Sequence, residues 1–354
     1  MNDLGELKRH VQVHARGQRI GDYRTVLDRI ATDDGGGPGS WAGEWSKAGE
    51  RLVRQGLDLE AAKYFAMARF PFVDGPARQE AQDRGVAAID RWRQRSRSGI
   101  EPFEADLPGG RVRCWAAGLS SRDPKPLLVL MGGIVTVKEQ WAPTLAKLGR
   151  LGMAGIVAEL PGVGANPLTY TPDSWRMLSG LLDALAGQAD VTRTYAIAMS
   201  FSGHMAMRCA VEDPRVKGIV TTNAPVKEFF TDGDWLRGVP RVTLDTLAHL
   251  SGSERLADWA LTEDQLAALD IPLAYMSCLR DEIIPAADLQ LLRKHVRDLK
   301  VREYDDVHGA PNHTEETQLW SIASLLEATG AAGPQRALIS MLLRGKELRR
   351  KLRK

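Results

Sequence analysis

Cysteine is scarce in this chain, and so are the features that mark secreted or membrane-embedded proteins. Only Cys114, Cys209 and Cys278 occur among 354 residues. Three cysteines at such wide spacings fit neither a disulfide framework nor a paired-cysteine metal site. The N-terminus lacks the apolar core of a signal peptide, and no run of about 18 apolar residues is present to span a bilayer. We therefore expect a cytoplasmic protein with no membrane partner.

An excess of charge of one sign is also nearly absent, since the net charge is only +2. A balance this close to zero gives no overall field for nucleic acid, and the basic run 344–354 is interpreted as a solvated helix end. The sequence Gly162-Val-Gly164 lacks the further glycine of a nucleotide-binding loop. We expect a small-molecule substrate, no cofactor, no metal and no nucleic acid, while a homodimer is left open.

What the chain does contain is an ordinary globular composition, with 44% hydrophobic and 26% charged residues. Residues 1–98 are predicted to form an N-terminal helical domain. Apolar residues from Trp41 onward recur at helical spacing, and the run 33–40 (Asp-Asp-Gly-Gly-Gly-Pro-Gly-Ser) breaks any regular element. We expect this domain to form one wall of the substrate pocket.

Residues 99–354 show a different pattern, typical of an α/β core. An alternating stretch around Pro108-Gly-Gly110 predicts an antiparallel hairpin. Beyond it, short apolar runs alternate mostly with helix-length segments, which predicts a mostly parallel central sheet with ligands beyond the carboxyl ends of its strands. The runs are 127–131, 155–158, 195–199, 216–221 and 273–278. The aromatic-rich segment 226–270 is either a lid insertion or ordinary core packing.

A candidate nucleophile follows the run 195–199. Ser200-Phe-Ser-Gly-His204 leads into an apolar helical stretch, which is the order of a nucleophile elbow. Such a turn needs small residues two positions before and after the serine. Ser200 has Ala198 and Ser202 there, whereas a nucleophile at Ser202 would place His204 in the second position. Ser200 is therefore the predicted nucleophile, although a serine that only caps a buried helix would look similar.

An oxyanion hole needs two backbone donors. One is the N–H of the residue after the nucleophile, here Phe201. The second is predicted at Gly133 or Ile134, which follow the run 127–131, and the alternative is a plain tight turn. Just beyond, Thr136 and Glu139 have the spacing of a capping box, and Trp141 is a candidate substrate contact.

The remaining partners come from late in the chain. Asp281 stands in the turn after the run 273–278 and is the predicted acid; Glu282 and a helix-capping role are the alternatives. His308 directly follows the last predicted strand, 299–304, and is the predicted base. His313 lies farther on and is expected to cap a helix or, with Ser202, to line the site. The order serine, aspartate, histidine is the order of α/β hydrolases.

Several of these segments together resemble the FrsA-like α/β hydrolases, which include 2,6-dihydroxypseudooxynicotine hydrolase and fungal naphthopyrone chain-shortening hydrolases. The resemblance rests on 60–69, Gly132-Gly133, Lys138-Glu139, the elbow, Asp281 and His308. Ala198 and Ser202 depart from it, because glycines are usual there. The resemblance implies hydrolysis of an ester or a ketone-adjacent carbon–carbon bond in a small metabolite, with aromatic polyketides among the candidates.

Two other functions are compatible with the same residues. A cyclase, lyase or epimerase would use His308 as a base without an acyl-enzyme. A binding protein would keep the fold without turnover, since a fold does not fix a function.

Overall fold

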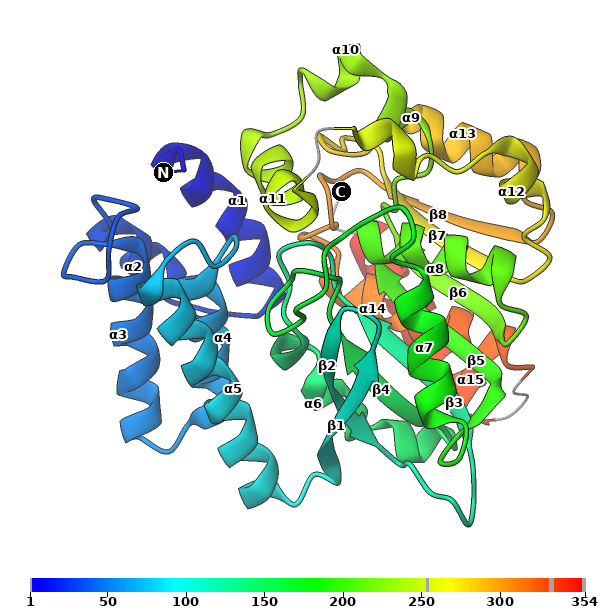
Figure 1. The fold of residues 1–354 in the computed structure, drawn as a ribbon, viewed down its shortest axis with the longest axis horizontal. Coiled ribbons are helices and arrows are strands. Elements are labelled where there is room, and N and C mark those ends of the chain that lie inside the picture. The colour runs from blue at the N-terminus through cyan, green and yellow to red at the C-terminus, as the bar shows by residue number, and fades with distance from the viewer. Residues whose placement is uncertain (1, 253–254, 331–333, 352–354) are drawn as a thin grey trace. The chain divides into compact units, whose positions relative to one another are not determined.

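The computed structural model describes residues 2–252, 255–330 and 334–351 (Figure 1). Eight strands are ordered β1-β2-β4-β3-β5-β6-β7-β8. Strands β1 and β2 pair antiparallel, and β5 to β8 pair in parallel. This confirms the predicted α/β class, with a mostly parallel sheet and a helical N-terminal region. Among the described residues, no helix is both long and apolar enough to cross a membrane.

The chain divides into two compact units, neither of which is continuous in sequence. The first unit comprises Met1–Ser120, Met131–Thr171 and Pro240–Glu254. The second comprises Ser121–Leu130, Pro172–Val239 and Arg255–Lys354. The predicted boundary at residue 98 and the predicted pocket wall stay predictions.

The first unit is built on packed N-terminal helices. Trp41 and Trp45 are fully buried, and the Trp41 indole N–H donates to the Met67 carbonyl at 2.9 Å. Gly49 lets α3 approach α4, because a Cβ there would lie 2.9 Å from the Phe65 ring. The elements of this unit are α1 (Leu4–Gly17), α2 (Tyr23–Arg29), α3 (Trp41–Arg54), α4 (Asp58–Arg69), α5 (Pro76–Ser96), β1 (Ile100–Leu107), β2 (Gly110–Ala117), η1 (Lys138–Gln140), α6 (Ala142–Leu145), η2 (Leu148–Leu151), β4 (Ala154–Ala158) and α11 (Arg241–Ser251).

The second unit holds the parallel strands β5 to β8. The central residues of β6 and β7 are almost all buried, as near-continuous apolar runs predict, whereas those of β8, at the end of the strand order, are half-buried or exposed. The carboxyl ends of β5 to β8 therefore meet at one edge of this part of the sheet. Its elements are β3 (Pro126–Met131, whose last residue belongs to the first unit), α7 (Arg176–Leu185), β5 (Asp190–Met199), α8 (Phe201–Glu212), β6 (Val216–Thr222), α9 (Glu228–Thr231), α10 (Gly233–Leu236), η3 (Leu256–Trp259), α12 (Glu263–Ala267), β7 (Leu273–Cys278), α13 (Ala286–His295), β8 (Leu299–Tyr304), α14 (Thr314–Ala328) and α15 (Pro334–Lys351).

The segment 226–270 folds into short helices, and its residues 253–254 lie outside the described part of the chain. Phe229 and Phe230 are buried and make edge-to-face contacts with Phe201. Trp259 is buried as well. These aromatics therefore serve core packing, and a lid role for the segment stays a prediction. The basic run 344–354 is helical as far as Lys351, and 352–354 lie outside the described residues.

Candidate active site

Ser200 alone connects strand β5 to helix α8. Its backbone has φ 57° and ψ −124°, a conformation that costs energy for any residue with a Cβ. The Ser200 N–H donates to the Thr222 carbonyl at 2.8 Å, which fixes the turn against β6. Ser202 instead lies within α8, is fully buried, and donates its hydroxyl to the Met199 carbonyl at 2.9 Å. The strained elbow position thus falls on Ser200 and not on Ser202.

The tight packing behind this elbow centres on Gly203. A Cβ there would lie 1.9 Å from Thr221 Oγ1 and 2.9 Å from the Ala198 carbonyl oxygen. Ala198 is itself fully buried. Only glycine fits at 203 without a shift of β5 or β6, whereas Ser202 is accommodated two residues after the nucleophile. The elbow pattern alone did not single out position 203.

The first turn of α8 leaves a backbone donor next to Ser200. The N–H groups of Gly203 and His204 donate to the Ser200 carbonyl at 2.8 and 3.3 Å. Phe201 is the first residue of the helix, where an N–H has no intrahelical acceptor and the helix dipole favours negative charge. The other predicted donors, Gly133 and Ile134, belong to the first unit, and their role stays a prediction.

The structure brings Asp281 and His308 together. Asp281 follows β7, His308 follows β8, and both carboxylate oxygens lie 3.0 Å from His308 Nδ1. Asp281 Oδ1 also accepts from the N–H groups of Ile283 and Ile284, at 2.8 and 2.9 Å. The Asp281 side chain is 3% exposed and that of His308 18%.

Because a carboxylate only accepts hydrogen bonds, Nδ1 of His308 carries the proton that faces it, and Nε2 has the lone pair. Burial alone would lower the pKa of His308, but the charge and hydrogen bond of Asp281, with the charge of Glu282, raise it. This histidine is a stronger base than a free one.

Two further residues complete the surroundings of the pair. Glu282, the alternative acid, accepts the backbone N–H of His308 at 3.0 Å and so anchors the loop. Asn223, which sequence reasoning missed, donates from Nδ2 to Asp281 Oδ2 at 2.5 Å. Its position just after β6, at the carboxyl end of a predicted strand, was the signal that could have found it.

His313 forms a second, separate pair with Asp306. Its Nδ1 lies 2.7 Å from Asp306 Oδ2, and its side chain is almost fully buried. Asp306 also accepts from Asn312, through the backbone N–H at 2.8 Å and Nδ2 at 2.9 Å. His313 occupies the N-cap position of α14, as the capping alternative expected, but its side chain makes no cap bond. Its predicted substrate contact stays a prediction, as does that of Ser202.

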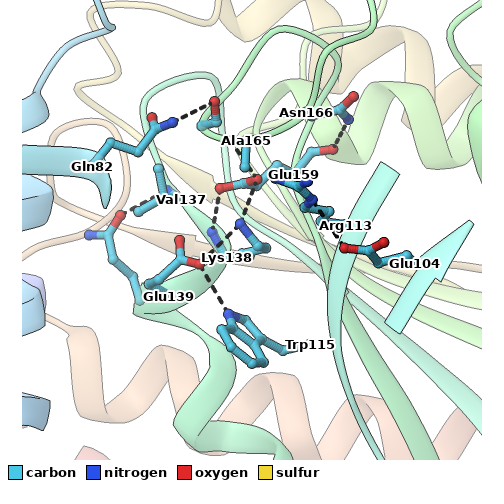
Figure 2. Close-up of polar contacts among 12 residues, drawn as sticks. Gln82, Glu104, Arg113, Trp115, Val137, Lys138, Glu139, Glu159, Ala165 and Asn166 are labelled. Atoms are coloured by element: carbon cyan, nitrogen blue, oxygen red, sulfur yellow. Dashed lines mark hydrogen bonds and ion pairs between the residues drawn. The ribbon is translucent and has the colours of Figure 1, made fainter. Parts of the chain in front are cut away.

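In the first unit, Lys138 lies in a buried ion cluster (Figure 2). Its Nζ is 3.0 Å from Glu139 Oε1 and 3.2 Å from Glu159 Oε2, and its backbone N–H donates to Glu159 Oε1 at 3.0 Å. The Trp115 indole N–H donates to Glu139 Oε1 at 3.0 Å. The predicted capping by Glu139 is wrong, because Gln140 Oε1 accepts the N–H of Val137 instead.

This cluster fixes the loop 132–140, which carries Gly133 and Ile134. Arg69 of α4 is buried and donates to the carbonyls of Val135 and Pro71. Burial lowers the pKa of Arg69 to about 10, so it stays charged at neutral pH. Burial would lower the pKa of Lys138, but the two neighbouring carboxylates raise it instead. The positive charges of Arg69 and Lys138 thus balance the negative charges of the two neighbouring glutamates.

The loop is also closely packed at its start. A Cβ at Gly132 would lie 2.6 Å from Thr136 Cβ and 2.8 Å from Trp141 Nε1. Trp141 therefore packs against the loop backbone, and its predicted substrate contact stays a prediction. Among the described residues, no group of three or more His, Cys, Asp or Glu side chains is placed to hold a metal ion.

A strained serine turn after β5, a carboxylate after β7 and a histidine after β8 are the arrangement of the α/β-hydrolase fold. Residues 35–271 match the model of the family described as "Esterase FrsA-like". The chain belongs to this family and is an α/β-fold hydrolase, which confirms the resemblance found in the sequence.

Solved structures and curated proteins agree with this assignment. The structure of "AbyA5 Wildtype" is 50% identical with a TM-score of 0.94, over 97% of this chain and 99% of that one. The 2,6-dihydroxy-pseudo-oxynicotine hydrolase shares the fold, at 20% identity and TM-score 0.67, over 88% and 96%. Esterase FrsA of Photobacterium profundum is 21% identical over 77% of this chain and 73% of its own. Esterase FrsA of Citrobacter koseri is 26% identical over 63% of this chain, which spans 58% of its length.

Proposed function

We propose that this enzyme is a serine hydrolase that forms an acyl-enzyme on Ser200, with His308 as base and Asp281 as the residue that orients it. The observation that carries the proposal is the strained backbone of Ser200. A buried serine with φ 57° stands at a strand-to-helix turn whose strain disfavours most residues, as in a nucleophile elbow.

The reaction follows from the atoms at hand. Ser200 Oγ attacks the carbonyl carbon and gives its proton to His308 Nε2. The oxyanion accepts from the Phe201 N–H, and Gly133 and Ile134 stay the predicted source of a second donor. His308 then protonates the leaving group, and a water deprotonated by the same Nε2 hydrolyses the acyl-enzyme.

The bond cleaved is proposed to be an ester or a carbon–carbon bond beside a ketone. In the second case the leaving carbanion is stabilised as an enolate or phenolate before His308 protonates it. Support comes from the curated FrsA relatives, which are named esterases, and from the fold shared with the 2,6-dihydroxy-pseudo-oxynicotine hydrolase. The substrate is proposed to be a small metabolite, with aromatic polyketides to be tested first.

A fluorophosphonate probe tests the nucleophile directly, because it reacts only with an activated serine. We expect labelling of the wild type and of Ser202→Ala, and none of Ser200→Ala. Labelling that survives Ser200→Ala, or disappears with Ser202→Ala alone, would contradict the assignment.

One observation favours a second candidate function, an elimination or related non-hydrolytic step. The Asp281–His308 pair forms between a residue after β7 and one after β8, and Ser200 is not needed to hold the two side chains together. In an elimination, His308 Nε2 would take a proton next to a carbonyl while a leaving group departs from the neighbouring carbon. Product formation by Ser200→Ala together with loss in His308→Ala would establish this second function.

A further inference from the structure

Asn223 is a buried, conformationally strained residue aimed at the acid of the proposed triad. Its φ is 49°, and it is 1% exposed. Asparagine is among the few residues other than glycine that adopt this conformation, at some cost. The backbone N–H of Asn223 donates to the Met276 carbonyl of β7 at 2.8 Å. Strand β6 thus ends in a turn that directs the Asn223 amide at Asp281 Oδ2.

Cys278 determines which way the Asn223 amide faces. Its Sγ lies 3.4 Å from Asn223 Oδ1. Burial raises the pKa of Cys278 to about 12, so the thiol stays protonated and its S–H donates a hydrogen bond to Asn223 Oδ1. The amide oxygen therefore faces Cys278, and the amide N–H groups face Asp281.

The Asp281 carboxylate is then held by donors on every side. The N–H groups of Ile283 and Ile284 hold Oδ1, while Asn223 holds Oδ2. Both oxygens remain equidistant from His308 Nδ1. Without the Asn223 amide, Oδ2 would keep only its contact with the imidazole, and the donors at Oδ1 alone would have to hold the carboxylate against rotation about its Cβ–Cγ bond.

We propose that Asn223 is a positioning residue for this reaction: it fixes the plane of the Asp281 carboxylate so that His308 keeps the ring orientation needed to reach Ser200. The inference rests on the proposed function, because it assigns Asn223 a role through the acid–base pair. It adds a fourth side chain, which follows β6, to the groups that follow β5, β7 and β8.

The charges around Asp281 make the inference testable by pH. The titratable groups near it are His308, Glu282, Cys278, Tyr275 of β7 and, beyond Cys278, Asp306. Of these only His308 becomes a cation. A second carboxyl introduced at position 223 would therefore share one proton with Asp281, because two adjacent carboxylates resist being ionised together.

The experiment measures the rate of fluorophosphonate labelling against pH for the wild type, Asn223→Ala and Asn223→Asp. Asn223→Ala should label about 10²-fold more slowly, the typical cost of a small misplacement of a catalytic group. Asn223→Asp should approach the wild-type rate at low pH, where its protonated carboxyl still donates to Asp281. Its rate relative to the wild type should fall as pH rises, because the second negative charge keeps His308 protonated and repels Asp281.

Asn312→Asp is the matched control. The Asn312 amide donates to Asp306 as that of Asn223 donates to Asp281, but Asp306 pairs with His313 and not with His308. The rate of this variant relative to the wild type should show no such decline. A wild-type rate in Asn223→Ala, or an equal loss at every pH in Asn223→Asp, would overturn the inference. The Asn223→Asp profile decides alone if Asn223→Ala does not fold. Labelling of Ser200→Ala would instead refute the proposed function.

Discussion

Gly203→Ala tests whether the elbow is closed by contact between α8 and the ends of β5 and β6. The new methyl group would lie 1.9 Å from Thr221 Oγ1, 2.9 Å from the Ala198 carbonyl oxygen and 2.9 Å from Ala224 Cβ. Ala198 and Thr221 are paired in the parallel ladder and fully buried, so neither moves without disturbing the sheet.

The magnitude follows from two opposed effects. Overpacking of a core costs about 1–3 kcal/mol, and three contacts below 3 Å favour the upper end of that range. Replacing glycine by alanine within a helix recovers up to ~1 kcal/mol. We therefore expect a loss of about 2 kcal/mol in the free energy of unfolding. The labelling rate should fall by about 10²-fold, because the start of α8 carries both Phe201 N–H and Ser200.

Urea unfolding gives the free energy, and fluorophosphonate labelling gives the activity. Gly187→Ala is the control, since a Cβ at Gly187 would meet no atom within 4 Å. It should change the free energy of unfolding by no more than about 0.5 kcal/mol. Equal stability and equal labelling of the two variants would refute the contact argument.

Three further predictions concern the acid–base pair and the buried ion cluster. His308→Ala should slow labelling by about 10²–10⁴-fold, while His313→Ala should mainly lower stability; the reverse result would exchange their roles. Because the pKa of His308 is raised above its ordinary value of 6.5, the wild-type labelling rate should fall as pH drops through that raised pKa. Asp281→Asn should move this fall to lower pH, and an unmoved profile would contradict the charge argument. Lys138→Met should cost about 3–5 kcal/mol by urea unfolding, because two buried carboxylates lose the cation that contacts both of them, whereas Arg237→Ala, at an exposed pair, should cost less than about 1 kcal/mol.

The fold class and the candidate triad could be predicted because their signals are local. Apolar runs mark buried strands, and a parallel sheet brings the residues after those strands to one edge. Ser200 directly follows such a run, Asp281 lies in the turn after another, and His308 lies on the loop after the last strand. Chain order alone was then enough to connect them.

The other contacts could not be predicted, because each joins segments that are distant in sequence or depends on the exact loop conformation. Periodicity does not show that Asn223 faces Asp281, or that Gly203 faces Thr221. Glu139 and Gln140 are adjacent, and both can reach back to a helix start. Only the loop geometry sends Glu139 to the Trp115 indole and leaves the capping to Gln140.

The discontinuous first unit has a consequence for modular exchange. Arg69 of α4 donates to the Val135 carbonyl. Gln82 of α5, labelled in Figure 2, donates to the Gly164 carbonyl at 3.0 Å. A cut at residue 98 would separate both donors from their acceptors, and a buried acceptor left unsatisfied costs about 1–3 kcal/mol. Helices α1 to α5 therefore cannot be exchanged as an independent module. A chimera that takes them from a relative must take the loops after β3 and β4 from the same parent.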